Sequence, residues 1–138
     1  MILQQTAIYQ VQIQLEKMLK SQHPNRPLVC DRGSLDPIAY WPHTASHFLK
    51  TVNTSLDQET NRYEWVIHLD TAQSTAYNQD HNSRPESFPD ASKLSNKIKQ
   101  AWNSHPKRVV LGSTSKFSKK METTLWLFKE IYRGAQFV

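Results

Sequence analysis

The residues with the clearest capacity for chemistry are Asp31, Arg32 and Gly33, which directly follow the short apolar run Leu28-Val29-Cys30. An apolar strand that ends in aspartate is the pattern that places a carboxylate beside a Mg²⁺–phosphate cluster. The guanidinium group of arginine is planar and can donate two parallel hydrogen bonds to phosphate oxygens. Because the same three residue types also form ordinary turns, this pattern leaves open both a phosphate-handling site and a structural turn.

Other residues that could do chemistry form weaker patterns. His43 and His47 are four residues apart, a spacing that can hold a metal ion on one helix face, but no third ligand accompanies them. We expect them to be exposed polar residues. His68 lies within an apolar run and is expected to be a hydrogen-bonded histidine of the core. The single cysteine, Cys30, excludes an internal disulfide and is expected to be a small buried residue.

Glycine is scarce, and this limits the kinds of phosphate site that the chain can hold. The three glycines are Gly33, Gly112 and Gly134. A phosphate loop built from backbone N–H groups needs several glycines in one short window. Neither G-x-x-x-x-G-K-[S/T] nor G-x-G-x-x-G occurs in the 138 residues, so they carry no glycine-rich phosphate loop.

The composition is that of one folded domain. The four Trp, five Tyr and five Phe are too many for a disordered chain of 138 residues. No apolar run approaches the roughly 18 residues that span a membrane, and no secretory signal opens the chain, so a cytoplasmic protein without membrane contact is expected. Residues 91–138 carry ten Lys/Arg against two Asp/Glu. This basic end is typical of solvated Lys-rich helices, and a nucleic-acid surface is the alternative that it leaves open.

The elements that must position these groups alternate between helices and short apolar runs. Apolar residues at helical spacing predict a first helix over about 2–21, which ends before the breaker cluster at 23–27. Strands are predicted at 28–30, 65–69 and 108–111, and the first of them is expected to be a buried parallel strand. Further helices are predicted at 36–41, with Asp36 as the N-cap and Pro37 in the first position, and at 45–52, 56–62 and about 90–105.

The final helix is expected to begin after the capping residue Ser115 and to face the core with five apolar residues, namely Phe117, Met121, Leu125, Phe128 and Tyr132. Residues 72–90 are polar and are predicted to form a loop. This alternation of elements predicts an α/β fold with a parallel sheet and right-handed crossovers.

The stretch L-V-C-D-R-G-S-L-D-P-I-A-Y-W-P, residues 28–42, resembles V-V-C-D-R-G-x-L-D-x-x-A-Y-W-P of the NadR-like AAA-domain family, which are P-loop NTPases related to nicotinamide riboside kinase. Residues 62–69 are similar to the family's R-Y-D-x-V-I-H-L strand, and residues 101–106 match its A-W-x-x-H-P. Further similarities are Gln12 and Glu16 of the opening helix, the T-A…Y…N-x-R-x-E lid at 71–86, and the late F-x-x-K at Phe117 and Lys120.

The resemblance implies one domain over residues 1–138 with a three-layer parallel sheet of the P-loop kinase type and with 72–90 as its lid loop. In that family a first strand, the phosphate loop and its helix precede the segments found here. We therefore expect the domain to be N-terminally incomplete, with the first strand and the phosphate loop missing. Loss of a central strand predicts unpaired strand edges, an open apolar groove and marginal stability.

The resemblance also implies Mg²⁺ and ATP as cofactors, with a nucleotide and an unknown small-molecule acceptor as partners. Asp31 would be catalytic, holding Mg²⁺ through water or accepting a proton from the acceptor. Arg32 would contact the transferred phosphate, and Arg84 would close onto the phosphates from the lid. Ser113 would be nucleotide-binding, close to the base.

Asp36 and Tyr40 would bind the acceptor substrate by the same resemblance. Each role has a structural alternative. Asp36 is a favourable helix cap, Tyr40 suits a core position, and Arg84 could pair locally with Glu86.

Two functional hypotheses follow. The first is an ATP-binding P-loop NTPase or kinase-like domain for phosphoryl transfer or ATP hydrolysis, inactive in this chain because no Walker A loop is present. The alternative is a non-catalytic binding module, acting through an open sheet groove or through the basic C-terminal third. An open groove would accept a strand donor or lead to self-association.

Overall fold

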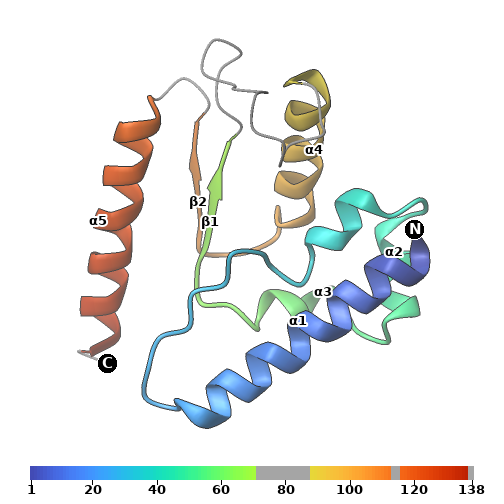
Figure 1. Ribbon diagram of the computed structural model, residues 1–138, viewed down its shortest axis with the longest axis horizontal. Coiled ribbons are helices and arrows are strands. Elements are labelled where there is room, and N and C mark those ends of the chain that lie inside the picture. The colour runs from blue at the N-terminus through green and yellow to red at the C-terminus, as the bar shows by residue number, and fades with distance from the viewer. Residues whose placement is uncertain (71–87, 113–115, 137–138) are drawn as a thin grey trace. The chain divides into compact units, whose positions relative to one another are not determined.

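The computed structural model describes residues 1–70, 88–112 and 116–136 (Figure 1). The elements in chain order are α1 (Ile2–Gln22), the 3₁₀ helix η1 (Asp36–Tyr40), α2 (Ala45–Thr51), α3 (Leu56–Thr60), β1 (Val66–Leu69), α4 (Phe88–Ala101), β2 (Arg108–Leu111) and α5 (Phe117–Gln136). The chain divides into two compact units. The first unit is Met1–Glu64 with Asn96–Pro106, and the second unit is Trp65–Ser95 with Lys107–Val138.

The predicted helices of the first unit are confirmed, and local capping explains where two of them begin. The Thr44 side chain accepts a hydrogen bond from the His47 backbone N–H at 3.2 Å, which starts α2. Ser55 and Gln58 form a reciprocal capping box at the start of α3. Each cap satisfies backbone N–H groups that the first helical turn leaves without partners.

Helix α1 buries a different side from the one that carries most of its aliphatic residues. Its buried residues are Gln5, Tyr9, Ile13 and Glu16, which recur at helical spacing. Its exposed apolar residues include Ile8, Val11, Leu15 and Met18. The buried side therefore combines two core residues with two polar side chains.

The core of the first unit is a small aromatic and aliphatic cluster of Tyr9, Ile13, Trp41, Phe48 and Val52. The Phe48 ring meets Tyr9 and Trp41 in edge-on contacts, with ring centroids 5.7 Å and 5.1 Å apart. Edge-to-face geometry is favourable for aromatic pairs. This cluster fixes α1 against η1 and α2.

The second unit contains a parallel pair of strands, as the alternation of elements predicted. Val66 of β1 pairs with Arg108 of β2, and the register continues to Leu69 and Leu111. The described part of the chain holds a two-stranded sheet. The three-layer sheet implied by the resemblance remains a prediction.

The strand predicted at 28–30 is wrong. No strand within the described residues pairs with this segment, and Val29 is 66% exposed. An isolated extended segment leaves its backbone groups without partners, so apolar composition alone does not make a strand.

The inner face predicted for α5 is also wrong, because all five of its residues are exposed. Phe117 is 72% and Leu125 is 51% exposed. Four-residue strands extend only about 13 Å, whereas a helix of 20 residues extends about 30 Å. The two strands are therefore too small to cover the helix.

None of the helices among the described residues is long and apolar enough to cross a membrane.

Candidate functional site

The Asp31-Arg32-Gly33 turn lies directly against Trp102. A Cβ atom at position 33 would overlap the Trp102 ring, lying 2.9 Å from its Cη2 atom and closer still to Cζ2. The indole Nε1–H of Trp102 donates to Asp36 Oδ1 at 2.7 Å, and both residues are buried. Glycine is therefore required here for close approach of the ring. The D-R-G-x-L-D and A-W-x-x-H-P segments are thus packed against each other.

Tyr63 connects this turn to α1. Its hydroxyl accepts from the Ser34 backbone N–H at 2.9 Å and donates to Glu16 Oε1 at 2.7 Å. Burial raises the pKa of Tyr63, and the Glu16 carboxylate raises it further. The phenol therefore remains a hydrogen-bond donor at neutral pH. Gln12 adds a second link, since its Nε2 donates at 2.8 Å to both Glu16 Oε1 and the Arg32 carbonyl oxygen.

A second buried network surrounds Glu59, whose side chain is 1% exposed. The Tyr9 and Thr54 hydroxyls each donate to its Oε1 at 2.7 Å, and Arg62 Nε lies 3.2 Å from Oε2. Burial alone would raise the pKa of Glu59. The hydroxyls of Ser34, Thr54 and Tyr9 and the charge of Arg62 outweigh burial and lower that pKa. Glu59 is thus an ionised anchor for three segments of the first unit.

Asp31 and Arg32 themselves remain exposed on this framework, and the Arg32 side chain is 64% exposed. Asp36 is different, because its carboxylate accepts from Trp102 and lies 3.7 Å from Arg32 Nη1. The prediction that Asp36 caps a helix is wrong, since Leu35 is the N-cap of η1 and no side-chain cap forms. Tyr40 is half-buried at the end of η1. The structure thus brings Arg32 and Asp36 together and leaves Asp31 exposed.

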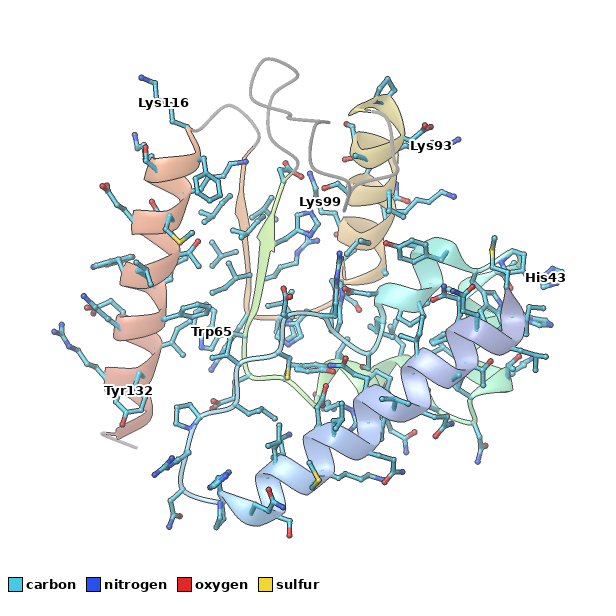
Figure 2. The ribbon with its side chains drawn as sticks, in the orientation of Figure 1. His43, Trp65, Lys93, Lys99, Lys116 and Tyr132 are labelled. Atoms are coloured by element: carbon cyan, nitrogen blue, oxygen red, sulfur yellow. The ribbon has the colours of Figure 1, made fainter. Side chains whose placement is uncertain are left out.

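A separate group of side chains gathers at the carboxyl end of β1 in the second unit, and we name it the strand-end cluster: His68, Asp70, Ser95 and Lys120. Asp70 Oδ1 accepts from the Ser95 hydroxyl at 3.3 Å and lies 3.4 Å from His68 Nε2. The Lys120 ammonium donates to the Asp70 carbonyl oxygen at 2.8 Å, and Lys120 is 8% exposed. Within this unit α5 begins at the end where the strands finish, with Lys116 before its first turn and Tyr132 near its other end (Figure 2).

Among the described residues, the strand-end cluster does not form a Ser–His–Asp relay. Ser95 Oγ lies 3.2 Å from His68 Nε2, and Asp70 Oδ1 approaches the same ring nitrogen. In a Ser–His–Asp relay, the serine and the aspartate bind opposite nitrogens of the ring. The prediction that His68 is buried and hydrogen-bonded is confirmed. The sequence could point to Asp70, because an apolar run ends at this aspartate. The contacts of Ser95 and Lys120 with Asp70 join segments that are distant in sequence, so no local pattern predicts them.

Metal-binding groups are few in the ranges 1–70, 88–112 and 116–136, where no cluster of three or more His, Cys, Asp or Glu occurs. His43 precedes α2, and its ring lies beside that of His47 with the centroids 4.6 Å apart. His47 Nδ1 accepts from the Trp41 indole at 3.1 Å. Both histidines are exposed, as predicted. Mg²⁺ requires less from the protein, because one or two carboxylates suffice beside waters and substrate phosphates. Asp31 is an exposed carboxylate of this kind.

Four sequence predictions lie outside the described residues, namely the catalytic role of Arg84, the nucleotide-binding role of Ser113, the helix cap at Ser115, and the lid at 72–90 over nearly all of its length. Cys30 is half-buried, and burial together with Glu16 raises its pKa to about 11. The thiol is therefore protonated at neutral pH.

Comparison with known proteins gives one match. A family model described as AAA domain matches residues 2–119. No curated protein and no solved structure matches the chain.

Proposed function

The chain belongs to the AAA domain family, which is P-loop NTPase-like, and from that premise we propose that it derives from an ATP-binding domain for phosphoryl transfer or ATP hydrolysis. The observation that carries the proposal is the strand-end cluster. It combines a carboxylate, Asp70, with a buried cation, Lys120, at the carboxyl end of a parallel strand.

This end of the sheet is where ligands bind in open α/β folds. The Lys120 ammonium has three N–H donors, and the contact described above uses one of them on a neutral carbonyl oxygen. A phosphate group is a suitable anion for such a buried charge. Ser95 orients the Asp70 carboxylate, which would hold Mg²⁺ through water. The bound Mg²⁺ would neutralise charge on the phosphates.

The NadR-like resemblance extends the proposal to the first unit. Asp31 would hold Mg²⁺ through water or accept a proton from the acceptor, and Arg32 would contact the transferred phosphate. Both side chains are exposed on a turn that Trp102, Tyr63 and Gln12 hold in place. By the same resemblance, Asp36 and Tyr40 would face the acceptor. Arg84 would close onto the phosphates, and Ser113 would lie near the base.

We further propose that these 138 residues bind Mg-ATP only weakly and do not turn it over. A phosphate loop supplies backbone N–H groups and a lysine that cradle the β- and γ-phosphates. No such glycine-rich motif occurs in the sequence. The described residues offer a cation and carboxylates but nothing equivalent to that loop.

Isothermal titration of the full chain with Mg-ATP tests this proposal. We expect binding in the millimolar range and no release of ADP. Lys120→Ala should weaken the binding further, whereas Lys119→Ala, an exposed neighbour on the same helix, should not. Micromolar binding with turnover would contradict the proposed lack of activity, and equal effects of the two variants would contradict the site.

A non-catalytic binding module is the second candidate, and the open sheet favours it. Within the described residues the sheet consists of β1 and β2, so each strand has one edge that no other described strand covers. Such edges accept a strand from a partner. Hydrogen exchange should find the outward-facing amides of β1 and β2 exchanging rapidly in the isolated chain. Strong protection of these amides would remove this candidate.

A further inference from the structure

One oxygen of the buried Glu16 carboxylate receives two hydrogen bonds. Glu16 is 3% exposed, and its Oε1 accepts from the Tyr63 hydroxyl at 2.7 Å and from Gln12 Nε2 at 2.8 Å. All three residues belong to the segment Met1–Glu64 of the first unit. These contacts therefore lie within one compact unit, and each of the two donors also contacts the backbone of the D-R-G turn.

The Gln12 side chain reaches the backbone immediately before Gly33. A primary amide nitrogen carries two N–H donors. Gln12 Nε2 donates to Glu16 Oε1 and to the Arg32 carbonyl oxygen, both at 2.8 Å. The bond to Glu16 therefore fixes the direction in which the amide presents its other N–H to the turn.

The Tyr63 side chain reaches the backbone immediately after Gly33. A phenol has one O–H donor, and Tyr63 donates it to Glu16. Its oxygen is thereby left to accept from the Ser34 backbone N–H at 2.9 Å. Burial and the Glu16 carboxylate raise the pKa of Tyr63, so the phenol keeps its proton at neutral pH. This orientation of the phenol requires an acceptor at position 16.

The second oxygen of Glu16 shows that stability alone does not account for a glutamate here. Oε2 is buried and has no well-aligned hydrogen-bond partner among the described residues, although the Cys30 thiol lies close enough for the carboxylate to raise its pKa. A buried carboxylate oxygen without a partner is unfavourable for folding. The carboxylate is therefore explained by the two donors that it orients.

We propose that Glu16 is a positioning residue for the D-R-G turn. It acts through Gln12 and Tyr63, which hold the backbone on the two sides of the glycine. The side chains of Asp31 and Arg32 are exposed, so their placement depends on the backbone of the turn. The role rests on the proposed function, in which these two side chains meet Mg²⁺ and the transferred phosphate.

Hydrogen exchange of the full chain tests this role at the Ser34 amide, with the Phe48 amide of α2 in the same unit as the reference. Glu16→Met fills the space without an acceptor and should speed Ser34 exchange relative to Phe48 about tenfold, the effect of one lost hydrogen bond. Glu16→Gln retains an acceptor oxygen and should keep the wild-type ratio. Equal acceleration of both amides, or an unchanged ratio in Glu16→Met, would overturn the proposal.

Two further variants keep the test decisive if Glu16→Met impairs folding. Tyr63→Phe removes the acceptor of the Ser34 amide and should speed its exchange about tenfold relative to Phe48. Gln12→Ala removes the other branch and should leave the Ser34 ratio unchanged while it shifts the resonance of the Arg32 carbonyl carbon. A wild-type ratio in Tyr63→Phe would overturn the proposal.

Titration with Mn²⁺, which replaces Mg²⁺ and broadens nearby resonances, separates this role from the proposed function. The Asp31 resonances should broaden in the wild type and in Glu16→Gln at lower Mn²⁺ concentrations than in Glu16→Met. The same concentration dependence in all three chains would overturn the positioning role. Absence of broadening in the wild type would contradict the proposed function at the turn, and the exchange ratio would still decide the role of Glu16.

Discussion

Substitution of Gly33 by alanine probes the contact between the D-R-G turn and Trp102. The new methyl group would overlap the Trp102 ring, which is 3% exposed and cannot move into solvent without cost. Overpacking of this kind costs about 1–3 kcal/mol. Displacement of the indole also weakens its 2.7 Å hydrogen bond to the Asp36 carboxylate, and bonds to charged groups contribute about 1.5–3 kcal/mol.

One effect opposes this loss. Alanine restricts the unfolded chain and thereby stabilises a protein by about 0.4–1 kcal/mol where the native backbone accepts it. None of the described glycines has a positive φ, so the backbone at Gly33 accepts alanine. The net expectation is a loss of about 2–5 kcal/mol, a large part of the 5–15 kcal/mol that stabilises a typical domain.

The assay is urea unfolding followed by circular dichroism and by tryptophan fluorescence. Gly134→Ala is the matched control, because its Cβ would meet nothing within 4 Å and the residue lies inside α5. Alanine in a helix is favoured over glycine by about 1 kcal/mol, so this control should become slightly more stable. A Gly33→Ala chain as stable as the wild type would refute the packing described for the turn.

Two further predictions concern buried groups. Glu59→Gln removes the ionised partner of Arg62 and should cost about 1.5–3 kcal/mol at neutral pH, the contribution of a hydrogen bond to a charged group. Because folding lowers the Glu59 pKa from 4.5, its stabilisation is present above that pH and is lost as the pH falls through the folded value, so the two chains should converge in acid-unfolding curves. Cys30, with its pKa raised to about 11 by burial and by Glu16, should react with iodoacetamide at pH 8 about 100-fold more slowly than in urea. Equal rates would contradict the burial of this thiol.

The sequence predicted the helices well because their signals are local. Apolar spacing and the breaker cluster at 23–27 lie within or beside the elements that they define. The parallel pairing of β1 with β2 also follows from the alternation of elements. The strand predicted at 28–30 failed because a strand requires a partner, which composition cannot supply.

The candidate site was less predictable because its contacts join distant segments. Asp36 has the local character of a helix cap, yet its carboxylate binds the indole of Trp102. Tyr63 and Glu16 are similarly far apart in sequence and meet through one hydrogen bond. The family resemblance placed Asp36, Trp102, Tyr63 and Glu16 in matching motifs. The structure adds that they are joined in pairs by hydrogen bonds.

The central proposal is that this AAA domain binds a nucleotide at the strand-end cluster. Amide chemical shifts of isotope-labelled protein, titrated with Mg-ATP, test it most directly. We predict saturable shifts in the millimolar range that concentrate at Asp70, Gly112 and Lys120 and vanish in Lys120→Ala. Shifts that are absent from these residues, or that persist unchanged in the variant, would contradict the claim.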